Sequence, residues 1–345
     1  MVKRPTISDL AEAADVSIST VNRILGGKQA VRLGTIQRVQ DAADRIGFYG
    51  LGSIEQHLMK ARPSFRLGFL MQQSKRQIYQ AMARQVVSAA RSRRNETVEP
   101  LVDFVDLLTP ENIAQRLIAL GRECDAVAII AADHPLIGQA IRTLRDAGKP
   151  VVAYISDQSA PDRAAYVGTD NWKLGRTAAY LIDRMTPGAG RIAVYLGNHR
   201  YQCQDAADAS FRSYIREHAP HLTIEDSRPT GEEPAEAYRM VSDLMDEADD
   251  IAGILIVGGG ISGVLQALRE APARRRDGIR VICRDIGPEA RQGLTEGLIT
   301  AALCHPLAPM SQTLIDTMIE AINRKEPGGA AQRTVPFDIV TPANI

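Results

Sequence analysis

Residues 6–48 read TISDLAEAADVSISTVNRILGGKQAVRLGTIQRVQDAADRIGF. Apolar residues recur here at helical spacing, which predicts three short helices near Ile7–Ala14, Ser17–Leu25 and Leu33–Ile46. Only Asp15 to Ser17 separate the first two helices. So tight a connection is typical of a helix-turn-helix, whose second helix is shaped to enter a DNA major groove.

Two hydroxyl side chains are placed to begin these helices. Thr6 precedes the first and Ser17 the second, and an oxygen at that position accepts hydrogen bonds from otherwise unpaired N–H groups. Short polar side chains and one arginine on the exposed face of the second helix would reach base edges and phosphates. We expect that face to carry Ile18, Ser19, Thr20, Asn22 and Arg23. The alternative is a small helical bundle whose arginine is merely solvated.

The order of residues in this stretch forms a dense pattern. It runs through Thr6-Ile7, Asp9-Leu10-Ala11, Ala14-Asp15-Val16-Ser17, Thr20-Val21-Asn22-Arg23, Gly26-Gly27, Val31, Thr35, Arg38-Val39 and Gly47-Phe48. This pattern resembles the headpiece of the lactose-repressor (LacI/GalR) family of bacterial transcription regulators. The resemblance implies that Ile18, Ser19 and Arg23 read bases. The other DNA contacts expected in the head are Thr6, Ser17, Thr20, Asn22, Arg32 and Thr35.

Two residues depart from the family pattern. Asp15 stands where the family has a turn glycine, and Asp tolerates a left-handed backbone less well than Gly. Arg32 stands where the family has a serine at the start of the third helix. The third helix therefore loses its N-cap, and a cation that attracts phosphate replaces it.

The charge is balanced overall but uneven along the chain. The 345 residues include 41 basic and 41 acidic ones. Residues 1–62 hold nine basic and six acidic side chains, an excess of three positive charges. A locally basic head on a neutral chain suits a phosphate-backbone partner at one end.

Residues 49–64, YGLGSIEQHLMKARPS, connect the head to the rest of the chain. Glycines loosen this segment, Pro63 ends it, and Ser53–Lys60 is expected to form a short helix. In the family the segment is a hinge helix that orders on operator DNA and wedges an apolar side chain into the minor groove. Leu58 is the expected wedge. Because Gly50-Leu51 and Ile54-Glu55 replace the family's usual residues, a plain linker remains the alternative.

From Arg66 onward, apolar strand runs alternate with amphipathic helices. The expected strands are Leu67–Met71, Leu101–Val105, Ala126–Ala131, Val151–Ile155, Ile192–Leu196, Thr223–Glu225, Gly253–Val257, Val281–Cys283 and Thr300–Cys304. The expected helices are near 77–94, 110–121, 136–147, 171–186, 205–218, 233–247, 261–271, 288–296 and 307–324. Such alternation predicts an α/β fold with doubly wound parallel sheets covered by helices.

This core of roughly 280 residues is too long for one doubly wound sheet, so two lobes are expected. The break lies near Ser159–Ala165, and the chain recrosses after Cys304 and near residue 330. The core resembles that of periplasmic binding proteins. The expected domains are a head at 1–48, a linker at 49–64, and a core at 65–345. Its N-lobe takes 65–162 and 305–330, and its C-lobe takes 163–304 and 331–345.

Ligands of open parallel sheets bind beyond the carboxyl ends of the strands. That rule, together with side chains suited to sugar hydroxyls, selects Gln72, Asp133, His134, Ser156, Asp157, His199, Arg200, Tyr201, Arg284, Asp285 and His305. By resemblance, Asp285 stands where the family's sugar-binding aspartate follows a strand. The pocket polarity is rearranged, however. Ile155, Ala207 and Gly258-Gly259 stand where the family has an aspartate, an arginine and an Asn-Asp pair.

No motif of an enzyme or a metal site occurs in the sequence. The four cysteines form no CxxC pair, and neither GxSxG nor HExxH is present. Gly258-Gly259-Gly260 lacks the Gly-Lys-Ser/Thr of a phosphate loop. No cofactor is expected. Because there is no apolar export segment or membrane-length run, we expect a cytoplasmic protein.

These observations predict a ligand-responsive bacterial transcription regulator, a repressor that binds a pseudo-palindromic operator as a homodimer. A sugar or related polyol in the interlobe cleft is expected to control its DNA affinity. One alternative is a sugar solute receptor without DNA function, which the absence of an export signal and the basic head oppose. A sugar-modifying α/β enzyme and a regulator that needs a purine-type corepressor are the others.

Overall fold

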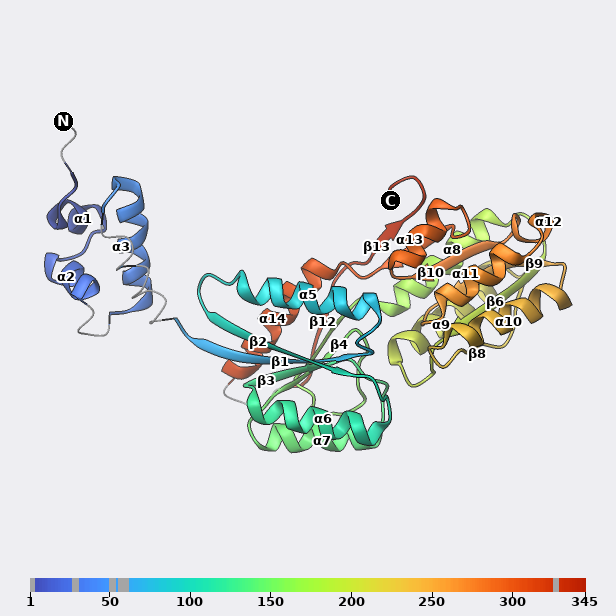
Figure 1. Ribbon diagram of the computed structural model, residues 1–345, viewed down its shortest axis with the longest axis horizontal. Helices are drawn as coiled ribbons and strands as arrows, with labels where there is room; N and C mark the ends of the chain where they lie inside the picture. Colours follow the sequence, from blue (N-terminus) through green and yellow to red (C-terminus); the bar gives the residue numbers. More distant parts are fainter. Residues whose placement is uncertain (1–3, 27–30, 50–53, 55–61, 325–328) are drawn as a thin grey trace. The chain divides into compact units, whose positions relative to one another are not determined.

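The computed structural model describes residues 4–26, 31–49, 54, 62–324 and 329–345. The chain divides into two compact units (Figure 1). One comprises residues 1–65 and 91–99, and the other comprises residues 66–90 and 100–345. Most of the expected linker helix, including Leu58, lies outside the described residues.

The head consists of three helices around one apolar core. They are α1 (Ile7–Ala13), α2 (Ile18–Gly26) and α3 (Leu33–Ile46). The predicted helices are confirmed because their apolar spacing gives each of them one buried face. The buried core includes Leu10, Val21, Ile24, Ile36, Val39, Phe48 and Ile54.

The ends of the head helices follow from single residues. Thr6 and Asp9 form a capping box at the start of α1, and the Ser17 hydroxyl accepts a hydrogen bond from the Thr20 N–H at 3.2 Å. Asp15 has a φ of +54°, so it takes the left-handed turn that the family gives to glycine. Arg32 makes no side-chain cap bond at the start of α3. The predicted caps and the predicted loss of a cap are therefore confirmed.

The first lobe is built on a six-stranded sheet with the order β12-β5-β4-β3-β1-β2. Its strands are β1 (Ser64–Gln72), β2 (Thr97–Val105), β3 (Ala126–Ile129), β4 (Val151–Tyr154), β5 (Ala165–Gly168) and β12 (Ala331–Thr334). Helices α6 (Pro110–Glu123) and α7 (Pro135–Asp146) cover one face, and α5 (Gln77–Arg91) and α14 (Leu307–Asn323) cover the other (Figure 1).

The second lobe is built on a seven-stranded sheet. Its main order is β13-β11-β10-β9-β6-β7, and β8 also pairs with β6. Its strands are β6 (Gly190–Leu196), β7 (Leu222–Ile224), β8 (Arg228–Pro229), β9 (Ile251–Ile256), β10 (Arg280–Arg284), β11 (Ala301–Cys304) and β13 (Asp338–Val340). All these pairings are parallel except that of β13 with β11.

Helices cover both faces of the second sheet. Leu174 of α8 (Asn171–Met185) and Phe211 of α9 (Gln202–His218) belong to the core on one face. The core on the other face contains side chains of α10 (Pro234–Glu247), α11 (Ile261–Glu270) and α13 (Pro288–Thr295). The short α12 (Ala273–Arg276) has no buried residue. The predicted α/β fold with parallel sheets is confirmed.

The points where the chain passes between the lobes differ in part from the expectation. The sequence predicts residues 163–168 and 331–334 in the second lobe, but β5 and β12 pair with each other in the first sheet. The crossings therefore follow Gly168, Cys304 and Thr334. Neither β5, with the sequence AYVG, nor β12 is among the predicted strands, and the polar sequence AQRT of β12 has no apolar run.

Among the described residues, none of the helices combines the length and the apolar character needed to cross a bilayer.

Candidate functional site

The exposed side of α2 carries side chains that the head does not use for packing. Val21 and Ile24 are buried, whereas Ile18 is 50% exposed and Asn22 and Arg23 are also exposed. The Arg23 Nε donates a hydrogen bond to the Ser19 carbonyl at 3.3 Å, which holds the guanidinium along the helix. An apolar group, an amide and a guanidinium therefore lie on one accessible face.

The hydroxyl groups at the start of α2 are engaged with one another. The Ser17 oxygen lies 2.9 Å from both the Ser19 and the Thr20 hydroxyl oxygens. The Thr6 hydroxyl donates to Asp9 at 2.8 Å as part of its cap. Ser17 and Thr6 thus have structural roles, and contacts from them to DNA remain predictions.

Two other expected DNA contacts lie at the start of α3. Arg32 is exposed and precedes the helix, and Thr35 is half-buried in its first turn. Leu58, the expected wedge, lies outside the described residues.

A cavity of about 310 Å³ opens between the two lobes. Its walls come from the starts of helices in both lobes: residues 75–79 before and within α5, residues 258–262 around the start of α11, and Gly287, Glu289 and Ala290 around the start of α13. Its size lies at the lower end of small-molecule sites. Three of the expected ligand residues, Arg284, Asp285 and His305, line it.

These three residues form one buried chain of polar contacts. The His305 Nδ1 lies 2.6 Å from the Asp285 Oδ1, and the Arg284 Nη2 lies 2.6 Å from the His305 Nε2. A guanidinium only donates, so the His305 Nε2 accepts and its Nδ1 carries the proton toward Asp285. Arg284 also donates to Thr169 and Asn171, which lie at the first crossing between the lobes.

The protonation states of this chain follow from burial and charge. Burial and the adjacent Arg284 lower the pKa of His305, although Asp285 opposes the shift. Burial alone would raise the pKa of Asp285, but His305 and Arg284 together lower it. The site at neutral pH therefore presents a neutral imidazole between a guanidinium and a carboxylate.

Several polar residues of this cavity are not predicted from the sequence, and four of them form one group. Arg76 of the first lobe pairs with Glu232 of the second at 2.9 Å, and Gln204 donates to the same carboxylate at 2.9 Å. Tyr79 lines the wall beside them, and burial next to Glu232 raises its pKa well above the usual value. Arg76 lies in the loop predicted after the first strand, but Glu232 follows β8, a two-residue strand with no apolar run.

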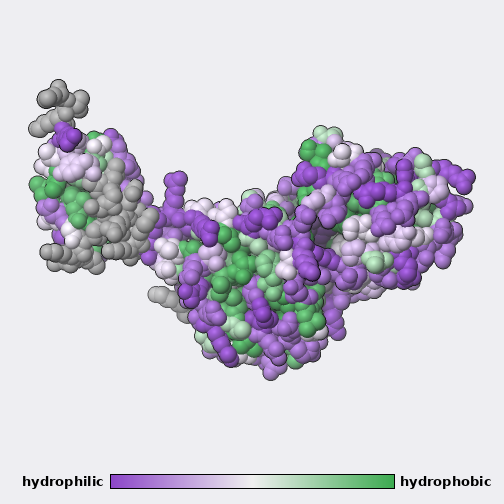
Figure 2. Space-filling view, viewed as in Figure 1, coloured by the Kyte–Doolittle hydropathy of each residue, from purple (hydrophilic) through white to green (hydrophobic). Residues whose placement is uncertain are grey.

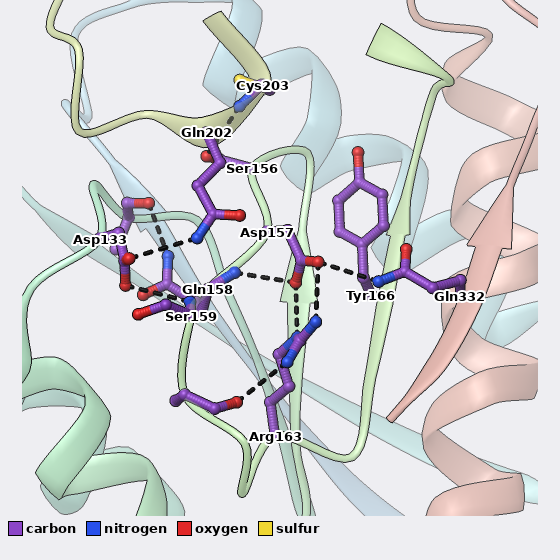
Figure 3. A network of polar contacts seen from close by, with 12 residues as sticks. Asp133, Ser156, Asp157, Gln158, Ser159, Arg163, Tyr166, Gln202, Cys203 and Gln332 are labelled. Atoms are coloured by element: carbon purple, nitrogen blue, oxygen red, sulfur yellow. Dashed lines mark hydrogen bonds and ion pairs between the residues drawn. The ribbon is translucent and has the colours of Figure 1, made fainter. Parts of the chain in front are cut away.

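The remaining expected ligand residues do not line this cavity, and several of them hold the two lobes together. Gln72 accepts from Tyr201 at 2.9 Å, and Ser156 accepts from the Cys203 N–H at 3.5 Å. Asp133 accepts from Gln202 at 3.2 Å and from the Ser159 N–H at 3.2 Å (Figure 3). Each of Gln72, Ser156 and Asp133 therefore joins the second lobe directly to the first.

The other expected ligand residues cap a helix, pair with a nearby side chain or, in the case of Arg200, make a main-chain contact between the lobes. His134 caps α7 through its Nδ1, and Asp157 binds Arg163 through both carboxylate oxygens (Figure 3). His199 and Arg200 are exposed. The His199 Nδ1 lies 3.4 Å from Asp205, and the Arg200 carbonyl accepts from the Asp133 N–H at 2.7 Å. A role of these residues in ligand binding remains a prediction.

The positions that depart from the family pattern also have clear surroundings. Ile155 has a φ of +67° and lines the cavity, so it adds an apolar wall where the family has an aspartate. Ala207 is fully buried within α9. A Cβ at Gly258 would lie 2.2 Å from the Gly197 nitrogen, so this position has no room for a side chain.

Comparison with known families agrees with this architecture. The model of the bacterial regulatory proteins of the lacI family matches residues 6–50, and the periplasmic binding protein domain matches residues 67–326. The chain belongs to the lacI family of bacterial regulatory proteins. In this lacI-family protein the helical head precedes a two-lobed periplasmic-binding-protein core. No match is found among curated protein sequences.

Solved structures share the fold of the lacI-family core. A solute-binding protein of an ABC transporter from Agrobacterium vitis with bound D-fucose is 17% identical, with a TM-score of 0.71 over 81% of this chain and 96% of that one. One from Burkholderia graminis in complex with D-arabinose is 20% identical, with a TM-score of 0.72 over 81% and 96%. GanP, a glucose-galactose binding protein from Geobacillus stearothermophilus, is 17% identical, with a TM-score of 0.72 over 82% and 99%.

Proposed function

We propose that this lacI-family protein is a ligand-controlled transcription repressor that binds operator DNA through α2. The observation that carries the proposal is the exposed face of α2, where Ile18, Asn22 and Arg23 serve no packing function in the head. An arginine suits guanine, an asparagine suits adenine, and an apolar side chain suits the thymine methyl group. Such a regulator acts in the cytoplasm and needs no cofactor.

The proposed effector is a sugar or related polyol in the cavity between the lobes. The cavity places Asp285 and Arg284 side by side, so that neighbouring hydroxyls would meet an acceptor and a donor. Two solved structures with the same fold hold D-fucose and D-arabinose, which supports a monosaccharide as the first class to test.

A homodimer is part of the proposal because one short helix reads too few base pairs for genomic specificity. The first lobe offers a surface for a second copy. Its edge strand β2 contains half-buried Leu101, Val102 and Phe104, and Leu107 beyond it is 62% exposed. Figure 2 shows apolar side chains gathered on this lobe. Covering them would supply the apolar core that protein interfaces need.

The proposed control is linkage between effector and operator. An effector that favours one arrangement of the lobes shifts the spacing of the two heads, and the heads then no longer match two half-sites. An effector that lowers operator affinity is an inducer. An effector that raises operator affinity is a corepressor, including one of purine type.

The test has two steps on the full chain. Selection from random double-stranded DNA is expected to recover a two-fold symmetric sequence. If no sequence were recovered, the proposal of operator binding would fail and the alternative of a solute receptor would stand. Operator affinity is then measured with D-fucose, D-arabinose, D-glucose, D-galactose, D-gluconate, D-glucose 6-phosphate and purine bases. We expect at least one monosaccharide or acidic monosaccharide derivative to change it tenfold or more, and an effect of purines alone would replace the sugar proposal.

A further inference from the structure

The cavity between the lobes contains a carboxylate that belongs to the chain itself. Glu232 lines the cavity but is only 6% exposed. The Gln204 Nε2 donates to one of its carboxylate oxygens at 2.9 Å, and the Arg76 Nη1 donates to the other at 2.9 Å. Arg76 also donates to the main-chain carbonyl of Glu232. The carboxylate is therefore bound as a ligand would be, by donors from both lobes.

Two glycines give this carboxylate its space. A Cβ at Gly197 would lie 1.6 Å from the Glu232 Oε1, and a Cβ at Gly259 would lie 2.1 Å from its Oε2. The carboxylate thus rests against bare backbone on two sides. Gly259 belongs to the turn that begins α11, where free N–H groups and the helix dipole favour negative charge. Gly197, Gly259, Gln204 and Arg76 together form what we call the carboxylate seat.

The backbone conformation at Glu232 is strained, and this conformation places the carboxylate in the seat. Glu232 has a φ of +68°, and the preceding Gly231 has a φ of +62°. A left-handed glutamate is uncommon, because its Cβ crowds the backbone. Such strain persists only where the surroundings determine the conformation, and it is typical of ligand clamps and switches.

Other charges around the cavity favour an anion. Lys75, Arg76 and Arg284 line it, as do the acids Glu232, Asp285 and Glu289. Asp285 is held by His305. Arg284 is 5% exposed, and its Nε has no hydrogen-bond partner among the described residues. If the Glu232 side chain moved out of the seat, three cations would face two acids, and Arg76 would lose its carboxylate partner.

We propose that Glu232 is an internal ligand of the cleft and that the effector carries an anionic group which takes its place in the carboxylate seat. The effector class is then an acidic sugar, either a sugar acid or a sugar phosphate, because carboxylate and phosphate both accept from a guanidinium and a helix N-terminus. This inference rests on the proposed function, because it names the chemistry of the effector of that same cleft.

The test removes the carboxylate from the seat by substitution and measures whether a free anion binds in its place. Glu232→Gly removes the carboxylate and suits a φ of +68°. The melting temperature of the full-length variant is measured in sodium acetate, inorganic phosphate and sodium chloride at equal ionic strength. Acetate or phosphate is expected to raise it by about 2–4 °C over chloride at saturation. The wild type, whose seat is filled, is expected to show less than half of that gain.

The matched control removes the cation of the seat. Arg76→Ala combined with Glu232→Gly is expected to lose the gain from the anion. If Glu232→Gly does not fold, Glu232→Asn carries the same test, because asparagine tolerates a left-handed backbone, is shorter and has no charge. A larger gain from acetate indicates a sugar acid, and a larger gain from phosphate indicates a sugar phosphate. Equal melting temperatures in all three salts for the single variant would overturn the proposal.

A second measurement compares acids with their neutral parents. D-gluconate, D-glucuronate and D-glucose 6-phosphate are each compared with D-glucose on Glu232→Gly, and the acids are expected to give the larger thermal shifts. A larger shift from D-glucose than from every acid would overturn the inference. Operator selection with the wild type is scored separately, so a failure of DNA binding would reject the proposed function without altering the result for the seat.

Discussion

His305 lies between a guanidinium and a carboxylate, and its two ring nitrogens have opposite tasks. Its Nε2 accepts from Arg284 at 2.6 Å, and its Nδ1 lies 2.6 Å from Asp285. A proton on the Nε2 would face the Arg284 N–H groups with no acceptor between them. The imidazole can thus hold both neighbours only while it is neutral, and this makes the geometry of the cavity wall dependent on pH.

We expect acid to weaken the core through His305. Its folded pKa is lowered by burial and by Arg284, whereas the unfolded residue keeps a pKa of about 6.5. The unfolded state thus binds more protons below that pH. The stability that the neutral imidazole contributes is fully present above about pH 6.5 and is lost as the pH falls through the folded pKa. The free energy of unfolding then changes by at most about 1.4 kcal/mol per pH unit.

Urea unfolding at several pH values between 7.5 and 5.5 measures this effect. The difference in unfolding free energy between the wild type and His305→Gln should shrink as the pH falls, because the glutamine does not titrate. A constant difference across this range would show that His305 does not titrate differently in the folded state.

Arg23 is expected to carry much of the DNA specificity. Arg23→Ala should reduce affinity for the selected operator about tenfold or more, because a well-placed bidentate contact to guanine contributes about 1–3 kcal/mol. Binding to unrelated DNA should fall far less. Fluorescence anisotropy with both DNAs at one salt concentration measures the two losses, and Arg38→Ala, an exposed change on α3, is the control. Equal losses on both DNAs would assign Arg23 to the phosphates.

The residues of the cavity were predictable only where a clear strand precedes them. Arg284, Asp285 and His305 end or follow apolar strands, so the rule for parallel sheets found them. Glu232 follows a two-residue strand. Its role depends on Arg76, which lies 156 positions away in the chain. No local pattern encodes a contact of that range, and only the folded chain shows it.

At the scale of elements, the start of α3 lacks a side-chain cap, which lowers the stability of the helix, and carries a positive charge in its place. Arg32 occupies the N-cap position with no side-chain bond, whereas Thr6 caps α1 through a capping box. Arg32→Ser is expected to stabilise α3 by about 1 kcal/mol, because a serine hydroxyl accepts from the first free N–H groups. Hydrogen exchange of the α3 amides in the full chain measures the gain.

The same change should weaken DNA binding if Arg32 contacts a phosphate. The slope of log affinity against log salt concentration is expected to fall in magnitude by about 0.9, the value for one lost phosphate contact. Arg38→Ser is the matched control, because it removes an exposed arginine from inside α3 without creating a cap. If the α3 amides gained hydrogen-exchange protection while the slope of log affinity against log salt concentration stayed unchanged, Arg32 would make no contact with a DNA phosphate.

Most helices and strands followed from apolar periodicity, because each of them buries one face or both. The elements that sequence reasoning missed are short or polar: β5, β8, β12, β13 and α12. The strands among them are held by pairing with neighbouring strands, and such pairing needs no apolar run in the sequence. Missing β5 and β12 shifted two of the three crossings between the lobes.

At the scale of the whole molecule, the proposed control is a single coupling free energy, so it must act in both directions. If a sugar changes operator affinity by some factor, operator DNA must change the sugar affinity by the same factor. Calorimetry of the sugar with and without bound operator, together with DNA titrations with and without sugar, measures both. We expect a factor of about 10–150 each way. Unequal factors would mean that an unrecognised third species takes part.

The last strands of the two lobes lie close together in the chain. Residues 331–334 complete the edge of the first sheet as β12, and residues 338–340 complete the edge of the second as β13. During synthesis neither lobe is finished until these residues emerge. At about 5–20 residues per second, the head precedes them by roughly 15–60 s. A ribosome-bound chain thus carries the complete sequence of the proposed DNA-binding head before the proposed sensor is complete.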